Sequence, residues 1–363
     1  MLIVSEAEIT IITDQGMNTG TGRYAFAVYN LLKEDFPNMC ILQLAHVKSV
    51  PIPNAIRPSF IRPARNLLLF PIQKRRNLKM IKSHSHFLNS NLHLCGSDYS
   101  LTSESENCIC TVHDYFFRFP NADSFRNRKE LLSEIYIDYY NLLTPRQIKR
   151  CSGIVVSSFS AQRDMLKKLG LKSKVVHFWA DDNFKQRNKD QSLEKLELPK
   201  GKKLLLNVSG AGANKNLPTL QRIADILPAD FAIVKVGHPI DHPRVINVGT
   251  VSAADYPHYF NSVSVYVNTS LQEGFCIPLI ESLSSGLPIV SPKIPPFDEI
   301  LGDAAAYVRN PIDEREYLDQ VMSVLEEAER QKLSSKSLER GKKFSKESAK
   351  PSLIEMYKQC FKL

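Results

Sequence analysis

The 363-residue sequence lacks any apolar run long enough to cross a bilayer. The longest run, residues 67–72, is interrupted by Pro71 and falls far short of the roughly 18 residues that a membrane span needs. Residues 1–8 contain two glutamates and no basic residue, which is not the pattern of a secretory signal peptide. From these absences we expect a cytoplasmic protein.

Cysteine is also scarce. The seven cysteines are odd in number and scattered, which excludes a disulfide framework. Cys108 and Cys110 are separated by a single residue, a spacing that suits neither a zinc site nor a redox pair. Their alternation with apolar residues predicts a buried strand instead. No carboxylate motif for a metal is present, so we expect no metal site.

Acidic residues are absent from residues 37–97, although nine lysines and arginines lie there. The rest of the chain is neutral, with 47 − 9 = 38 basic residues against 38 acidic ones, so this segment carries the whole net charge of +9. A local positive field attracts anions. In residues 57–82 the charges interleave with apolar residues. This pattern fits an anionic membrane surface at the inner face of the membrane, and equally a solvated helix face around a buried apolar stripe. No nucleic-acid-binding motif accompanies it, so we expect no nucleic-acid partner.

What the sequence does contain is an alternation of short apolar runs with amphipathic stretches, which predicts an α/β fold with parallel sheets. The alternation restarts after a charged stretch at residues 185–203, which predicts a linker and a second domain. We therefore expect two doubly wound, Rossmann-like domains facing each other across a cleft, with ligands at the strand carboxyl ends. The predicted domains are residues 1–184 and 185–345, followed by a helix at 346–363 that crosses back to the first domain.

The predicted strands are residues 9–12, 40–45, 92–95, 108–112, 154–157, 204–208, 231–236, 245–248 and 263–268. The predicted helices begin near Arg23 and Asn216 or span residues 160–169, 277–286, 313–330 and 348–361. Ser160 and Gly170 are the expected ends of the helix at 160–169. A glycine-containing turn at residues 18–22 precedes the first helix.

Two glutamates mark the candidate site. Glu273 follows a strand in a glycine-bearing loop, and Glu281 lies in the next helix. Gly274 allows backbone amides to approach a ligand, and the helix start offers N–H groups that suit a phosphate or a sugar. The carboxylates would then accept hydrogen bonds from sugar hydroxyls. The alternative is that both are solvated surface residues, which the combined strand, loop and helix pattern disfavours.

The C-terminal half resembles the family-4 retaining nucleotide-sugar glycosyltransferases, which have the GT-B fold. The resemblance rests on VINVGTVS (residues 245–252), EGFCIPLIESLSSGLPIVS (273–291) and the stretch 299–306. The N-terminal half agrees more loosely, through GTGRY (20–24), TVHD (111–114) and VSSFS (156–160).

This resemblance implies roles for individual residues. Glu273 would contact the donor sugar, Glu281 the ribose hydroxyls and Lys215 the diphosphate. His113 would also contact the donor sugar and, like Glu273, would be a catalytic residue. Asp114 would orient the imidazole of His113 or cap the next turn. The remaining residues implied for donor binding are Gly20, Gly22, Gly210, Gly274, Phe275, Cys276 and Leu279. A lysine beside helix N-termini would stabilise the charge on the departing diphosphate without a metal.

The sequence departs from the family pattern at three positions. Many members have an arginine where this chain has Gly210 and a basic residue where it has Asn214, which leaves Lys215 and backbone amides to hold the diphosphate. Cys276 stands where glycine is usual, and its bulk would narrow the choice of sugar.

The implied function is transfer of a sugar, with retention, from a nucleotide diphosphate donor to a hydroxyl of a glycan or lipid-linked acceptor. The Lys-Asn-Leu stretch from Lys215 leans towards GDP-mannose and leaves UDP-linked donors open. No cofactor besides the donor substrate is expected. The alternatives are a catalytically inactive glycosyltransferase-like subunit and a sugar-nucleotide epimerase of the same fold.

Overall fold

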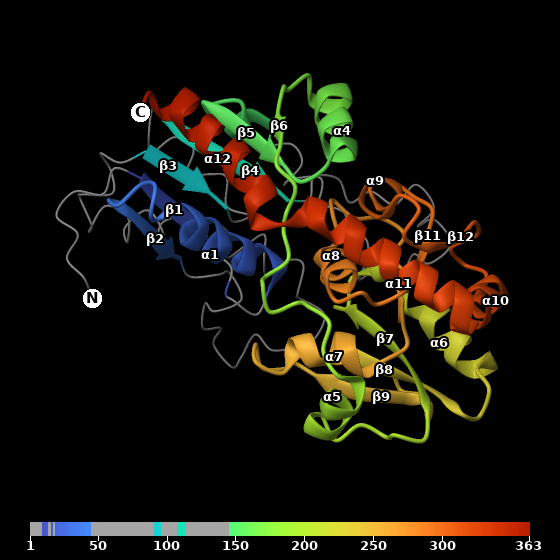
Figure 1. Cartoon of the computed structure of the whole chain (residues 1–363). Helices are drawn as coiled ribbons and strands as arrows, with labels where there is room; N and C mark the ends of the chain where they lie inside the picture. Colours follow the sequence, from blue (N-terminus) through green and yellow to red (C-terminus); the bar gives the residue numbers. More distant parts are fainter. Residues whose placement is uncertain (1–8, 14–15, 17–18, 45–90, 96–106, 114–144) are drawn as a thin grey trace, which may run out of the picture. The chain divides into compact units, whose positions relative to one another are not determined.

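The computed structural model describes residues 9–13, 16, 19–44, 91–95, 107–113 and 145–363. The chain forms two compact units: residues 1–176 with 350–363, and residues 177–349 (Figure 1). The sequence placed the boundaries at 184/185, before a charged stretch, and at 345/346, before the last helix. The contacts between residues instead divide the chain after residue 176, directly after the last strand of the first unit, and after residue 349, inside the final helix. Residues 57–82 lie outside the described residues, so their membrane role stays a prediction.

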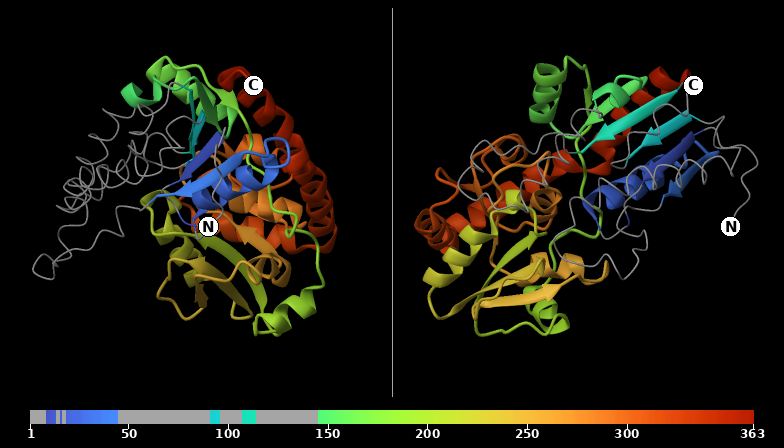
Figure 2. Two further views of the ribbon diagram at one scale, coloured as in Figure 1. Left: turned by 90° about the vertical axis from the view of Figure 1, so that its left-hand side faces the viewer. Right: turned by 180° about the vertical axis from the view of Figure 1, so that it is seen from behind.

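The first unit contains a six-stranded parallel sheet in the order β2-β1-β3-β4-β5-β6. Its strands are β1 (Ile9–Thr13), β2 (Met39–Gln43), β3 (Asn91–Leu94), β4 (Cys108–Val112), β5 (Gly153–Val156) and β6 (Lys174–Val175). The first five were predicted, whereas β6 is too short to give a pattern. Every residue of β1 and β4 is buried, which confirms the interpretation of Cys108 and Cys110 as strand residues. Figure 2 shows the strands of this sheet, coloured from blue to green, from two further directions.

Helix α1 (Gly20–Leu32) packs against β1 and β2, and α4 (Phe159–Leu169) packs against β5 and β6. The prediction that α1 starts near Arg23 was wrong, because the Thr19 hydroxyl caps the helix three residues earlier. Ser158, not Ser160, caps α4 through a 3.0 Å hydrogen bond from the Ala161 amide. Gly170 ends α4 in the left-handed conformation (φ 65°), as predicted.

The second unit contains another six-stranded parallel sheet, in the order β12-β11-β10-β7-β8-β9. Its strands are β7 (Lys203–Ser209), β8 (Phe231–Gly237), β9 (Val245–Gly249), β10 (Val265–Val267), β11 (Ile289–Pro292) and β12 (Ala306–Val308). The first four were predicted and the last two were not. The chain runs outward from β7 to β9 on one side and from β10 to β12 on the other. This is the strand order of dinucleotide-binding domains, and it reverses between β7 and β10.

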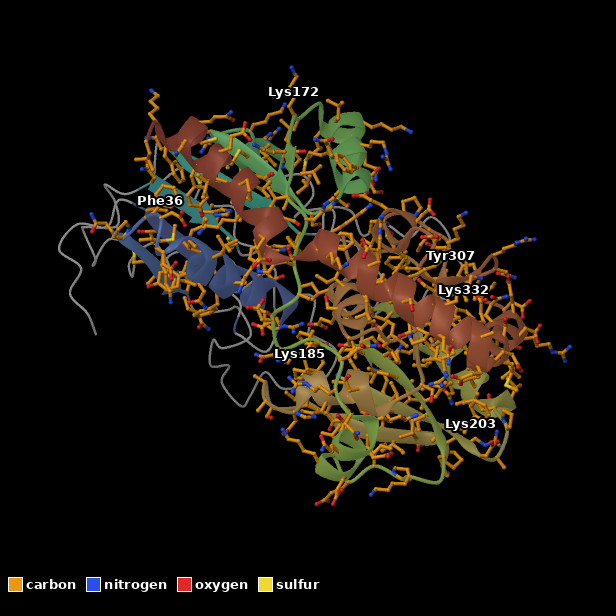
Figure 3. The ribbon with its side chains drawn as sticks, viewed as in Figure 1. Phe36, Lys172, Lys185, Lys203, Tyr307 and Lys332 are labelled. Atoms are coloured by element: carbon orange, nitrogen blue, oxygen red, sulfur yellow. The ribbon has the colours of Figure 1, made fainter. Side chains whose placement is uncertain are left out.

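The helices of the second unit are α5 (Lys189–Lys195), α6 (Leu217–Ile226), α7 (Tyr256–Ser262), α8 (Ile277–Ser284), α9 (Phe297–Leu301), α10 (Glu314–Leu325) and α11 (Glu327–Gly341). Apolar residues of α6 and α10 form one core with the inward residues of the sheet, such as Leu205 and Ile233. On the opposite face, Phe260 of α7 stacks on Tyr266 of β10. Lysines 185, 203 and 332 extend from the surface (Figure 3).

Two predictions for this unit were wrong. The supposed linker at 185–203 contains α5, which Asn188 caps and which packs against α7. The supposed single helix at 313–330 is two helices, because the backbone of Glu326 is extended (ψ 129°) and α11 then continues to Gly341. The final helix α12 (Lys346–Phe361) begins close to its predicted start. Over the described residues, no helix combines the length and apolarity that a bilayer span requires.

Candidate functional site

The reversal of strand order between β7 and β10 defines where a ligand would bind in the second unit. In open parallel sheets, ligands bind beyond the carboxyl ends of the strands at such a point. Two loops lie there, residues 210–216 after β7 and residues 268–276 after β10. They contain Gly210 and Lys215, and Glu273 with the glycine-bearing turn. The topology thus brings most of the residues predicted for the donor to one edge of one sheet.

The two loops are joined by hydrogen bonds through Asn214. Its carbonyl accepts from the Leu271 amide at 2.7 Å, and its side-chain amide donates to the Gln272 carbonyl at 3.0 Å. The Thr269 hydroxyl adds a 2.8 Å bond to the carbonyl of Lys215. In the sequence, Asn214 stands out only because a basic side chain is missing there. Its amide instead holds the glutamate-bearing loop against the lysine-bearing loop through the bond to the Gln272 carbonyl.

Lys215 and Glu273 form an ion pair between the Nζ and Oε1 atoms. The two side chains are 25% and 8% exposed, respectively, so the pair is largely shielded from water while the ammonium retains access to it. Hydrogen bonds to ionised groups are stronger than neutral ones, and more so in a shielded position. The structure therefore confirms that these two predicted residues lie together.

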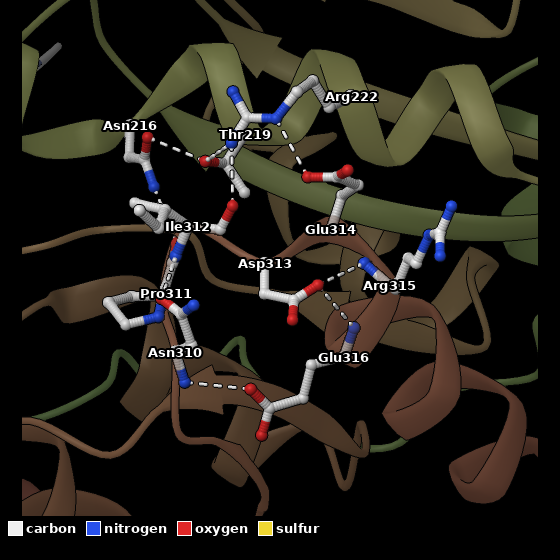
Figure 4. Close-up of polar contacts among 10 residues, drawn as sticks. All are labelled: Asn216, Thr219, Arg222, Asn310, Pro311, Ile312, Asp313, Glu314, Arg315 and Glu316. Carbon is white, nitrogen blue, oxygen red and sulfur yellow. Dashed lines mark hydrogen bonds and ion pairs between the residues drawn. The ribbon is translucent and has the colours of Figure 1, made fainter.

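The turn that follows Lys215 is held by polar contacts of Asn216 and of α6 (Figure 4). The next residue, Asn216, has a left-handed backbone (φ 51°), a conformation that asparagine tolerates better than most residues. Its side chain donates to the Pro311 carbonyl at 2.9 Å and accepts from the Thr219 hydroxyl at 3.0 Å. Arg222 of α6 bonds Glu314 at 3.0 Å. These contacts fix the turn from which the lysine extends.

Glu281 lies on α8 and is only 1% exposed. Its carboxylate accepts a 2.7 Å hydrogen bond from the hydroxyl of Tyr256, a partner that the sequence analysis missed. Burial raises the pKa of Tyr266 well above its usual range, and the charges of Glu281 and Glu273 add to the rise. Burial likewise raises the pKa of the Cys276 thiol, again with contributions from both glutamates. The two carboxylates therefore act on the same small region at the start of α8.

The glycine-bearing turn contributes backbone groups rather than side chains. Phe275 is buried in a cluster with the rings of Phe178, His177 and Phe344. Leu279 is fully buried, and its amide donates to the Cys276 carbonyl at 3.1 Å. Leu279 therefore closes the first turn of α8, and the side chains of Phe275 and Leu279 are packed inside the protein.

Cys276 itself has φ 83°, in the left-handed region that favours glycine. A residue with a side chain is strained in that conformation. This is a physical reason for glycine at the position, and it makes the cysteine of this chain an unusual choice.

The residues predicted from the N-terminal half form a separate group in the first unit. His113 follows β4, and its Nε2 atom lies 2.9 Å from the Cys95 carbonyl. Because a carbonyl only accepts, Nε2 carries the proton, and Nδ1 is the acceptor nitrogen of the neutral ring. The ring of Tyr24, from α1, meets the imidazole edge-on at 5.2 Å. Asp114 lies outside the described residues.

Gly20 and Gly22 lie in the first turn of α1 rather than in a loop before it. The Gly22 amide donates to the Thr19 hydroxyl at 3.0 Å, so the helix cap already uses this N–H.

A second feature that the sequence did not reveal lies beside this group. Buried His93 contacts Tyr357 of α12 at 2.6 Å and Thr111 at 2.8 Å, and burial lowers the pKa of His93 to about 3, with a further contribution from His113.

Among the described residues, no group of three or more His, Cys, Asp or Glu side chains is placed to hold a metal ion. The candidate site is thus one of acids, a lysine and backbone amides. Two Rossmann-like units in one chain, the second with these groups at its switch point, are the architecture of the GT-B fold.

Comparison with known proteins supports this classification. Residues 242–343 match the family Glycosyl transferases group 1, which confirms the resemblance to glycosyltransferases for that part of the chain. The sequence is 23% identical over 233 residues to the O-antigen chain mannosyltransferase RfbU of Salmonella typhimurium (strain LT2), a match that covers 60% of this chain and 61% of the relative. This chain therefore spans less than two thirds of that relative's length.

Solved structures show the same fold over nearly the whole chain. A sucrose-phosphate synthase from Thermosynechococcus elongatus superposes with a TM-score of 0.75 at 15% identity, covering 98% of this chain and 99% of that one. HepE of Anabaena, solved in complex with UDP and glucose, gives 0.71 at 14% identity, covering 97% and 99%. The predicted GT-B fold is confirmed.

Proposed function

We propose that the protein transfers a sugar from a nucleotide diphosphate sugar to a hydroxyl of a glycan or lipid-linked acceptor, with retention of anomeric configuration. The observation that carries the proposal is the ion pair between Lys215 and Glu273 at the switch point of the second sheet, with buried Glu281 on the helix that follows. A cation, two acids and backbone amides match the diphosphate, the hydroxyls and the leaving-group charge of such a donor.

Donor binding would exchange the partners of this ion pair. The diphosphate would attract the Lys215 ammonium, and the Glu273 carboxylate would turn to the hydroxyls of the sugar. Backbone amides of residues 274–276 would donate to the phosphate or the sugar, and Glu281 would accept from the ribose hydroxyls. The lysine would stabilise the charge that builds on the diphosphate as the glycosidic bond breaks.

In this scheme the acceptor hydroxyl needs no second carboxylate as a base. The leaving phosphate oxygen would take the acceptor proton on the same face of the sugar, which gives retention.

Mannose is the proposed sugar. The support is the similarity to a protein named as an O-antigen chain mannosyltransferase and the Lys-Asn-Leu stretch from Lys215. The same name supports a glycan acceptor. UDP-linked sugars are the second donor class to test, because HepE was solved with UDP and glucose.

The test is a thermal-shift screen of GDP- and UDP-linked sugars, followed by an assay for hydrolysis or transfer with the best donor. We expect one donor class to raise the melting temperature and to release its nucleoside diphosphate. The anomeric configuration of the released or transferred sugar, read by NMR, tests retention. A chain that binds no nucleotide sugar, or that binds one and leaves it intact with every glycan and lipid-linked acceptor tried, contradicts the proposal.

A further inference from the structure

Lys235 is a buried lysine near the carboxyl end of β8, and nothing in the sequence singled it out. Its side chain is 0% exposed. It is in register with Asn207 of the neighbouring strand β7, yet its Nζ atom donates to the carbonyl of Ser209 at 2.7 Å. The side chain therefore extends along the sheet towards the edge that holds the candidate site. A second bond, 2.9 Å long, goes to the Val236 carbonyl.

The charge of this ammonium is not neutralised. Both of these acceptors are carbonyls, and over the described residues no carboxylate forms an ion pair with Lys235. The nearby charge is that of Lys215, a second cation, and burial together with this cation lowers the pKa of Lys235 to about 8. Burying a charge without an opposite one is costly. Such an arrangement is explained if an anion binds beside it.

The bond to Ser209 also fixes the direction of a backbone amide. The Ser209 carbonyl accepts from both the Lys235 ammonium and the His238 amide, the latter at 3.0 Å. In a planar trans peptide the C=O and the following N–H point in opposite directions. The Gly210 N–H is therefore directed away from Lys235. A side-chain carbon added at Gly210 would meet no other heavy atom within 4 Å, so there is open space around this residue.

We propose that Lys235 is a positioning residue for the donor diphosphate. Lys235 holds the Ser209–Gly210 peptide so that the Gly210 N–H meets a phosphate oxygen, and its ammonium adds a positive charge behind that peptide. The inference rests on the proposed function, because it assumes that a nucleoside diphosphate group binds at this edge. It explains how the site manages without a basic side chain at position 210: the charge comes from the adjacent strand instead.

Lys235→Met tests the proposal, because methionine keeps the apolar stem and removes the charge and its hydrogen bonds. Lys203→Met is the matched control, since Lys203 lies at the opposite, amino-terminal end of β7, where it is exposed and paired with Asp230 (Figure 3). Both variants remove one positive charge. Binding of GDP and UDP is compared by calorimetry with binding of guanosine and uridine.

We expect Lys235→Met to weaken binding of the preferred nucleoside diphosphate about tenfold or more, as is usual when hydrogen bonds to a charged group are lost. Binding of the corresponding nucleoside should be unchanged, because the residue acts on the phosphates. Lys203→Met should bind both ligands as the wild type does. If the methionine variant does not fold, Lys235→Gln, which keeps an N–H donor without the charge, should show the same selective loss in smaller measure.

Three results overturn the inference. Unchanged diphosphate affinity in a folded Lys235 variant shows that the residue does not act on the phosphates, and it leaves the proposed function intact. Equal losses for nucleoside and diphosphate show a merely structural role. A wild-type protein that binds neither GDP nor UDP removes the proposed function and this inference with it.

Discussion

Lys215 and Glu273 form an ion pair although they are 58 residues apart in the sequence. Each lies in the loop that follows one of the two strands at the switch point, and Asn214 joins the two loops beside them. In this structure each residue therefore neutralises the other. This relationship gives separate expectations for binding and for turnover, because a substitution that removes the acid also releases the lysine.

Glu273→Gln should lower turnover while leaving the affinity for free nucleoside diphosphate equal to that of the wild type or higher. The amide no longer competes for Lys215, but it cannot provide the charge that the proposed reaction uses at the sugar. We expect kcat to fall by about 100-fold or more, the usual size of a lost electrostatic contribution to the transition state. Donor turnover and calorimetric binding of GDP or UDP measure the two effects separately, and weakened diphosphate binding with a normal kcat would contradict the assignment.

Glu281→Ala should have the opposite profile. The buried carboxylate is proposed to hold the ribose, so its loss should weaken nucleoside and nucleotide binding alike, by about tenfold. Tyr256→Phe is the matched control, because it removes only the hydroxyl that donates to Glu281. We expect it to weaken binding less than Glu281→Ala does. Wild-type affinity for the nucleoside in the alanine variant would show that Glu281 does not contact the ribose.

The sequence predicted the sheets well, because buried parallel strands have nearly continuous apolar runs that stand out between amphipathic helices. It missed β6, β11 and β12, which have two, four and three residues. It also missed the break at Glu326, which depends on one backbone angle in a polar stretch. The α1 start was missed because the glycines of residues 20–24 suggest a turn, whereas the Thr19 cap makes them the first turn of a helix.

For the site, the spacing from Glu273 to Glu281 after a strand was sufficient to predict that both acids lie near one helix start. The ion pair with Lys215 was predictable only through the family resemblance. Lys235 was not predictable, because a single lysine in an apolar strand gives no sign of where its ammonium goes. Its contact with Ser209 follows from the register of β7 and β8, which local sequence does not determine.

Cys276→Gly should relieve backbone strain. Cys276 is the residue before α8 and has φ 83°, which glycine adopts without the steric cost that a β-carbon brings. Cys276→Ala removes the sulfur and keeps the β-carbon, so the difference between the two variants isolates the backbone effect. We expect the glycine variant to be more stable than the alanine variant by about 1 kcal/mol, measured by urea unfolding. A glycine variant less stable than the alanine variant would mean that the left-handed backbone is not retained.

The pH dependence of stability should depend on Lys235. Burial, with the charge of Lys215, lowers the pKa of Lys235 from 10.5 to about 8 in the folded protein. Between about pH 8 and 10.5 the unfolded chain then keeps a proton that the folded chain has lost. Stability rises with pH wherever the unfolded state binds more protons, so this residue should increase the unfolding free energy over that interval.

The Lys235→Met variant lacks this contribution and otherwise has the same titrating groups. The unfolding free energy of the wild type minus that of the variant should therefore be lowest at neutral pH and should increase towards pH 10.5, by an amount on the order of 3 kcal/mol. Urea unfolding of both proteins at several pH values from 7 to about 10 covers most of the interval. Parallel curves would mean that Lys235 stays protonated throughout and that its charge is compensated within the folded protein. In that case the charge of Lys235 would not be the uncompensated one from which its role at the diphosphate is argued.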